Sequence, residues 1–393
     1  MEMKREDAQY SPVAGEPPSL GEHGTKPSRK YLYISVAILN VLYVMCGTTF
    51  VWSSPVLVKL TLTDTEGSTV ASMLSLGSVL GPFVSGAVLD SLGRKYTVGL
   101  AMALETTSYL TLAEGSGVII LSVGRFLGGV ASGIAFSAVP MYIAEISEDS
   151  VRGLLNTLSQ LSICSGSLLM YVVGPYTSYA VLHYIMLGLC AMFFLLFPLL
   201  PRSPYELVMS NQIAQAEKTL LWLRKNVPRS FVVKELQLIQ NTVREYEAES
   251  SSVKELFTCR GNRRALIICC TLLMLQQISG VTILLFYSEK IFRMSGSSLS
   301  SSASSIIVGA VMAGSAVICP VAVKKFGYKK PLLTSAAGMA VGMGGLAMFF
   351  ILKVNHFEVD SIGWLPLFSI VVYILFFNAG KSHNTIYTVP LAV

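Results

Sequence analysis

The chain has 393 residues, of which 52% are hydrophobic and 13% charged, and its formal net charge is +6. A soluble protein usually carries about a quarter charged residues, so this composition excludes a soluble enzyme, a nucleic-acid binder and a disordered protein. The charges are also clustered, with 10 in residues 1–30 and 18 in residues 202–264. Composition therefore predicts a polytopic membrane protein with a polar head and a polar central insert.

Ten segments are apolar enough to cross a bilayer as helices, which takes about 20 residues each. They lie near 31–53, 69–89, 96–113, 117–143, 156–176, 180–200, 265–288, 303–323, 332–352 and 362–380. The second and third are rich in Gly, Ser and Thr, which lets helices approach closely in lipid. We therefore expect an all-α membrane protein in which these two segments pack inside a bundle.

The charged stretches divide the chain into four expected parts. Residues 1–30 read as a disordered cytoplasmic head, and 31–201 as an N-terminal bundle of six helices. Residues 202–264 read as a cytoplasmic helical insert, because Val233, Leu236 and Ile239 recur at helical spacing. Residues 265–393 then form a second bundle of about four helices. A solvated linker is the alternative for the insert.

Lysine and arginine residues predict the orientation, because they concentrate on the cytoplasmic side of membrane proteins. With the N-terminus inside, the short cytoplasmic loops and termini carry 13 of them and the outer loops carry four. We expect a multi-pass plasma-membrane protein with a cytoplasmic N-terminus and no cleavable signal peptide. The histidines are too scattered for a metal site, and no nucleophile–base arrangement or nucleotide-binding loop occurs. The sequence therefore predicts neither enzyme activity nor a cofactor.

A series of motifs follows the predicted spans in a fixed order. Asp90, Gly93, Arg94 and Lys95 stand where the second span meets the cytoplasm, and Gly124-Arg125 opens a motif in the fourth. The chain continues with Glu145, Arg152, Gln160 and Gln276-Gln277, as well as Gly47-Thr48-Thr49 in the first span. In this order the chain resembles the sugar porter family of the major facilitator superfamily. Within it, the chain is most similar to the insect facilitated trehalose transporters.

The resemblance implies two six-helix bundles that alternate access to a site at the membrane midplane. It implies that Asp90, Arg94, Glu145 and Arg152 form a gating charge network, with simple pairing of helix ends as the alternative. It also implies that Gln160, Gln276 and Gln277 bind the sugar, together with Thr282, where the family usually has Asn. Side-chain amides both donate and accept hydrogen bonds, as sugar hydroxyls require. A buried Gln that only joins two helices is the alternative.

Two further charges stand inside predicted spans. Arg125 and Glu105 lie at similar depth in neighbouring spans of opposite direction. A charge in the membrane interior is costly unless it faces the bundle interior or has a partner. We expect the two to form an intramembrane ion pair with a structural role.

The family comparison also bears on energy coupling. Its proton-coupled members carry an Asp in the first span at the position of Thr49, and residues 31–53 contain no carboxylate. This favours facilitative uniport of trehalose or a hexose across the lipid bilayer, with a small-molecule sugar as the partner. The alternatives are a proton-coupled symporter and a sugar sensor that does not transport.

The resemblance fails in the second half of the chain. The repeated loop motif should contain an acid and an Arg, whereas Lys324 to Lys330 contain neither. Residues 381–393 do not match the family, and spans eleven and twelve are missing. We therefore expect a C-terminal bundle that is incomplete, as in a truncated or degenerate paralogue, which supports the non-transporting alternative.

Overall fold

The computed structural model describes residues 28–248, 257–258, 260–296, 299–318, 321, 325–326 and 329–380. Every element in these ranges is a helix, apart from an isolated antiparallel bridge between Ser28 and Lys225. This confirms the all-α class. The predicted C-terminus at 381–393 and the head up to residue 27 lie outside the described residues, as does most of the loop from Lys324 to Tyr328.

The chain forms two compact units, one of residues 1–33 with 202–250 and one of 34–201 with 251–393. We call the helices of 34–201 the N-half and those of 260–380 the C-half. The domain boundaries expected from the sequence stay a prediction. The N-half contains α1 (Lys30–Val51), α2 (Ser53–Leu57), α3 (Asp64–Glu114), α4 (Val118–Ile146), α5 (Asp149–Tyr176), α6 (Tyr179–Leu196) and the 3₁₀ helix η1 (Phe197–Leu199).

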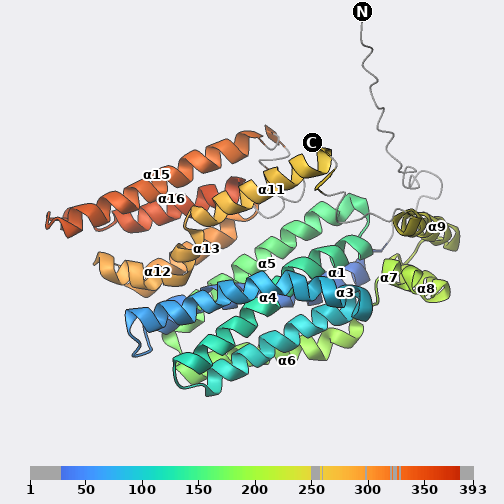
Figure 1. Cartoon of the computed structure of the whole chain (residues 1–393), viewed down its shortest axis with the longest axis horizontal. Helices are drawn as coiled ribbons and strands as arrows, with labels where there is room; N and C mark the ends of the chain where they lie inside the picture. The colour runs from blue at the N-terminus through green and yellow to red at the C-terminus, as the bar shows by residue number, and fades with distance from the viewer. Residues whose placement is uncertain are drawn as a thin grey trace, which may run out of the picture. The chain divides into compact units, whose positions relative to one another are not determined.

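The C-half contains α11 (Arg260–Ile278), α12 (Val281–Ser295), α13 (Ser301–Ser315), α15 (Lys329–Val354), the 3₁₀ helix η2 (Asp360–Ile362) and α16 (Leu365–Gly380). Figure 1 shows these helices in gold to red, and those of the N-half in blue to green. The two halves meet within one unit, where α13 packs on α5 and α12 on α2.

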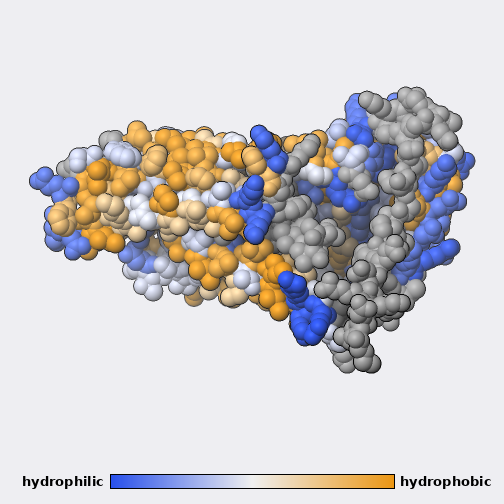
Figure 2. Space-filling view, turned by 90° about the horizontal axis from the view of Figure 1, so that it is seen from above, coloured by the Kyte–Doolittle hydropathy of each residue, from blue (hydrophilic) through white to orange (hydrophobic). Residues whose placement is uncertain are grey.

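Among the described residues, seven helices are long and apolar enough to cross a membrane. One of them is α3, whose 51 residues include two of the predicted spans. The helices α13 and α16 are apolar but shorter. Large hydrophobic side chains point outward along the N-half, including Phe83 at 74% exposure and Leu195 at 79%. Figure 2 shows hydrophobic residues across much of the surface. Lipid is the solvent that such a surface requires.

The long helix α3 folds back on itself at Gly93, the one residue within it that leaves helical geometry. Its φ of 80° lies in the left-handed region that favours glycine. A Cβ on Gly129 of α4 would lie 2.9 Å from Cα of Gly77, and one on Gly128 would lie 2.9 Å from Oγ of Ser108. Adjacent positions of α4 thus contact α3 residues about equally far before and after Gly93. The turn at Gly93 therefore joins two antiparallel spans.

Glycines let α3 and α4 touch backbone to backbone. A Cβ added to Gly81 would lie 2.5 Å from Cα of Gly133, and one added to Gly133 would lie 2.7 Å from the carbonyl oxygen of Ser78. Real Cβ atoms do not approach other atoms so closely, so a side chain at either position would separate the helices. Small residues at helix interfaces serve this close approach in lipid.

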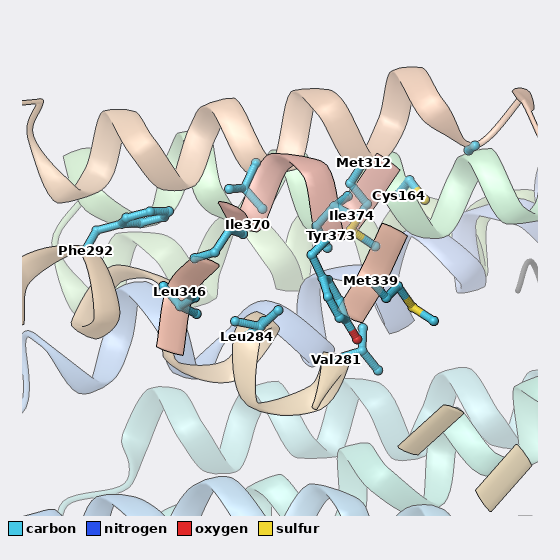
Figure 3. Packing of buried hydrophobic residues seen from close by; sticks show 12 residues of the cluster. Cys164, Val281, Leu284, Phe292, Met312, Met339, Leu346, Ile370, Tyr373 and Ile374 are labelled. Carbon is cyan, nitrogen blue, oxygen red and sulfur yellow. The ribbon is translucent and has the colours of Figure 1, made fainter. Parts of the chain in front are cut away.

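The C-half is held together by an apolar cluster that also includes one residue of the N-half. Cys164 of α5 packs with Val281, Met312, Met339 and Tyr373, as Figure 3 shows. The full cluster adds Leu284, Phe292, Val308, Ala316, Leu346, Ile370 and Ile374.

The smaller unit contains three amphipathic helices, α7 (Pro204–Met209), α8 (Ile213–Leu223) and α9 (Arg229–Ala248). Their buried residues include Leu207, Ala216, Leu220, Leu236 and Ile239, which form one hydrophobic core. Leu236 and Ile239 lie on the buried face of α9, whereas Val233 is 36% exposed and Val232 is buried in its place. The extent and cytoplasmic side of the insert stay a prediction.

Candidate functional site

The first group of candidate residues lies around the Gly93 turn. Arg94 Nε donates to both carboxylate oxygens of Glu145, at 2.9 and 3.1 Å, and Arg94 Nη1 lies 3.9 Å from Asp90 Oδ1. The side chains of Arg94 and Glu145 are 6% and 10% exposed, whereas Asp90 is 80% exposed. Arg152 Nη2 donates to the carbonyl oxygen of Ala144, beside Glu145. The structure thus gathers all four predicted charges at one end of the N-half.

The energetic centre of this group is the contact between Arg94 and Glu145. Opposite charges gain most from pairing where water is excluded, and an exposed pair gains little. Asp90 is exposed and distant from the guanidinium, so its contribution is small. Because α3 carries Arg94 and α4 carries Glu145, this pair joins the hairpin to the next span.

The second group lies in the interior of the N-half, where Glu105 and Arg125 are both fully buried. They do not contact each other directly. The Thr49 hydroxyl donates to Glu105 Oε1, and Arg125 Nη1 donates to the carbonyl oxygen of Thr49 at 2.5 Å. Glu105 Oε2 and Arg125 Nε and Nη2 have no hydrogen-bond partner in the described structure. Thr49 therefore links the two charges that we expected to form a direct pair.

Aromatic residues complete the surroundings of Arg125. Its Cζ lies 5.1 Å from the ring of Trp52 and 5.7 Å from the ring of Phe286, which belongs to α12 of the C-half. Trp52 Nε1 donates to His183 Nε2 at 2.9 Å, and His183 Nδ1 bonds to the carbonyl oxygen of Tyr179. A carbonyl can only accept, so Nδ1 carries the proton and the imidazole is neutral. Arg125 is thus the cation of an otherwise neutral aromatic cluster.

The third group surrounds a break between α11 and α12. Gly280 adopts a left-handed conformation there, with φ of 86°. Gln276 and Gln277 close α11 just before the break, and the Thr282 hydroxyl donates to Gln277 Oε1 at 3.1 Å. The break leaves backbone groups and amide side chains together, an arrangement with which transporters bind ligands at interrupted helices.

Gln160 lies on α5, one helical turn before Cys164. Its Nε2 lies 3.7 Å from Cys164 Sγ, and its buried Oε1 has no hydrogen-bond partner in the described structure. Cys164 belongs to the same buried cluster as Val281, Met312 and Tyr373. Cys164 thus joins α5 to the apolar cluster of the C-half, where α5 packs on α13. No direct hydrogen bond joins Gln160 to Gln276 or Gln277 in the part of the chain that the structure describes.

Sequence reasoning missed several polar residues that hold this arrangement. The Tyr373 hydroxyl lies 2.9 Å from Ser279 Oγ and 3.1 Å from the Ser279 carbonyl oxygen. Asn378 Nδ2 donates to the carbonyl oxygen of Met312 and to Ser315 Oγ. A polar side chain inside an apolar span is a signal for such contacts, but it does not name the partner.

Comparison with known proteins gives a consistent result. Residues 23–387 match the family model described as sugar (and other) transporter. The chain is 32% identical to the facilitated trehalose transporter Tret1 of Bombyx mori, over 88% of this chain and 68% of that protein. It is also 32% identical to Tret1 of Anopheles gambiae, over 90% of this chain and 46% of that protein. The chain thus spans less than half of the mosquito protein.

Solved structures show the same fold at lower identity. The partially occluded, inward-open xylose transporter XylE of E. coli matches with a TM-score of 0.75 and 21% identity, over 93% of this chain and 86% of that chain. The nucleoside transporter NupG matches with a TM-score of 0.56 and 14% identity, over 88% and 80% of the two chains. These likenesses support the major facilitator fold.

Proposed function

This chain belongs to the sugar transporter family of the major facilitator superfamily, and we propose that it carries a sugar across the plasma membrane by facilitative uniport. Trehalose or a hexose is the proposed substrate, since the similar proteins of Bombyx and Anopheles are described as trehalose transporters. The N-terminus is cytoplasmic in this proposal, because the basic residues concentrate in the loops on that side.

The observation that carries the proposal is the buried, unpartnered Oε1 of Gln160 on α5, in a chain whose helix break at Gly280 follows Gln276 and Gln277. A buried acceptor without a partner is unfavourable, by about 1–3 kcal/mol. A sugar hydroxyl would donate to it, and the amide Nε2 could donate in turn. Substrate binding would thus satisfy a group that is unsatisfied in the empty site.

Gating is assigned to the Gly93 end of the N-half. We propose that the pair of Arg94 and Glu145, supported by Asp90 and Arg152, holds the hairpin of α3 to α4 in one of the two transport states. Such a contact suits a gate because a nearly buried ion pair stabilises the state that forms it and is absent from a state that separates its partners.

A second candidate function is proton-coupled symport, and Glu105 is the observation that favours it. The first span has Thr49 where proton-coupled members have an Asp. The carboxylate of Glu105 on α3 nevertheless lies next to Thr49, because the Thr49 hydroxyl donates to it. Its free Oε2 lies in the membrane interior, where carboxylates often serve as proton relays. A non-transporting sensor is the third candidate.

Uptake of radiolabelled trehalose and glucose into oocytes tests these functions together. Saturable uptake that is unaffected by external pH and membrane potential is expected for uniport. Uptake that follows the proton gradient, and that loses this dependence in Glu105→Gln, would favour symport. Surface expression without uptake of either sugar would contradict both.

Gln160→Leu tests the site. It should lower uptake by about tenfold at low sugar concentration, since one lost hydrogen bond in a site built for hydroxyls has this order of effect. Gln215→Leu, on α8 of the insert, is the matched control.

A further inference from the structure

The helix α12 is joined to the N-half at the end of the molecule opposite the Gly93 turn. Lys290 Nζ lies 2.6 Å from Asp64 Oδ1, at the start of α3, which runs one full span before reaching Gly93. The backbone N–H of Glu289 donates to Ser54 Oγ at 3.0 Å, and the Tyr171 hydroxyl donates to the carbonyl oxygen of Leu285 at 3.3 Å. The two halves are therefore closed on each other at this end.

A cavity of about 400 Å³ lies at this junction, with walls from both halves. Ser53, Ser54 and Asp64 contribute from the N-half, and Phe286, Lys290 and Arg293 contribute from α12. Phe286 is only 6% exposed. Besides lining the cavity, its ring contacts the buried guanidinium of Arg125. Its ring therefore stands between this cavity and the polar interior that contains Thr49 and Glu105.

Arg125 has few other means of stabilising its charge. It makes one hydrogen bond, to the Thr49 carbonyl oxygen, while Nε and Nη2 lack hydrogen-bond partners in the described structure. The faces of Trp52 and Phe286 compensate, because the π-electrons of an aromatic ring attract a cation, most strongly where water is excluded. Trp52 moves with Arg125, whereas Phe286 belongs to the other half. Separation of the halves would remove one of the two rings.

We infer that Arg125 is a positioning residue that holds the ring of Phe286 closed over the interior, and so favours the state in which this end of the molecule is shut. The inference rests on the proposed function, because it requires two states that differ in the position of α12. It gives Arg125 a role across the two halves, in addition to its contact with Thr49. Phe286 is then the gate, and Arg125 is the group that attracts it.

The test measures how often this end of the molecule opens far enough to expose a buried residue of the junction, in the purified chain in detergent. Ser53→Cys is the reporter, since Ser53 is fully buried, lines the cavity, and has a hydroxyl without a hydrogen-bond partner in the described structure. Its rate of modification by a hydrophilic maleimide is compared with the same chain lacking the reporter, which gives the background of the seven natural cysteines. Size-exclusion chromatography checks that each variant is folded.

Phe286→Leu keeps an apolar side chain but removes the ring, and it should speed reporter modification by about threefold to tenfold. Phe286→Tyr keeps the ring and should stay within about twofold of the parent. In an Arg125→Gln background, which has no cation, replacing Phe286 by Leu should add nothing further. If Arg125→Gln does not fold, the labelling rates of Phe286→Leu and Phe286→Tyr still show whether the ring keeps this end closed.

Equal modification rates in the Leu and Tyr variants would overturn the inference, because the ring would then have no special role. An undiminished effect of Phe286→Leu in the Arg125→Gln background would also overturn it, since Phe286 would then act by packing alone. The labelling needs neither sugar nor a gradient. Its outcome therefore stands apart from that of the uptake experiment.

Discussion

The N-half and the C-half of the membrane unit are stabilised in different ways. The N-half buries charges and gives them partners, as Arg94 does with Glu145, and as Glu105 and Arg125 do with Thr49. The C-half relies mainly on an apolar cluster and on neutral hydrogen bonds such as that between Tyr373 and Ser279, and among its described residues Glu289 is the one buried charge. Charged contacts depend strongly on both partners, so the N-half should be more sensitive to single substitutions.

The largest effect is expected from breaking the pair of Arg94 and Glu145. Glu145→Gln leaves the guanidinium of a nearly buried Arg94 without its carboxylate, which should lower the free energy of unfolding by about 3 kcal/mol. Thermal unfolding of the purified protein would measure it. Asp90→Asn is the control and should change stability by less than about 0.5 kcal/mol, since Asp90 is exposed. Similar losses in both variants would show that burial does not set the difference.

A somewhat smaller loss is expected where the N-half packs backbone on backbone. In Gly133→Val the new Cβ would meet Ser78 and Gly81, so α3 and α4 must separate, at a cost of about 2–3 kcal/mol. Gly188→Val is the matched control, because nothing lies within 4 Å of a Cβ at that position of α6. The yield of monodisperse protein in size-exclusion chromatography, together with its melting temperature, would measure the loss. Equal behaviour of the two valine variants would argue against the close contact.

The C-half should respond more weakly. Tyr373→Phe removes the hydroxyl that bonds to Ser279 beside the break at Gly280, and should lower stability by about 1 kcal/mol. Tyr176→Phe, whose side chain is largely exposed, should change nothing. A loss in Tyr373→Phe as large as that in Glu145→Gln would contradict the contrast between the halves.

The smallest effect on stability is expected outside both halves, in the insert. Arg229 donates to Glu217 in the insert, and this hydrogen bond holds the pKa of the Glu217 carboxyl below its usual range. A carboxyl whose pKa is lower in the folded than in the unfolded protein stabilises the fold at pH values above its unfolded-state pKa. This contribution is lost as the pH falls through the folded-state pKa. The difference in melting temperature between the parent and Glu217→Gln should therefore be small near pH 7 and should shrink as the pH falls through the lowered pKa of Glu217. A difference that grows on acidification would contradict this assignment.

The sequence predicted those features that depend on local composition. Hydropathy located the spans, and Asp90 to Lys95 indicated a turn that the left-handed Gly93 provides. The small residues of 69–89 and 96–113 predicted that both segments pack inside the bundle. Both are parts of α3, and glycines of the first touch α4, but its other face is exposed, as Phe83 at 74% shows, so the prediction was wrong for that face. Predictions of spans and turns succeed because each depends on a few neighbouring side chains and on the lipid around them.

Contacts between distant helices could not be predicted in the same way. Depth in the membrane placed Glu105 near Arg125, but hydropathy does not reveal the rotation of a helix about its axis, so the intervening Thr49 was missed. Phe286 over Arg125 and Tyr373 on Ser279 likewise depend on how helices pack. The family resemblance supplied the candidate amides, whereas the structure supplied their neighbours.

The turn at Gly93 also has a consequence for how the protein is made. Residues 64–114 reverse direction with almost no loop, so the two spans of α3 cannot enter the bilayer one at a time with a soluble segment between them. They must insert together as a helical hairpin. Arg94 and Lys95 at its tip would then remain on the side of synthesis, because carrying two cations through the hydrocarbon core is unfavourable. On this argument, the short turn that brings Arg94 to Glu145 would also set the topology of these two spans during biogenesis.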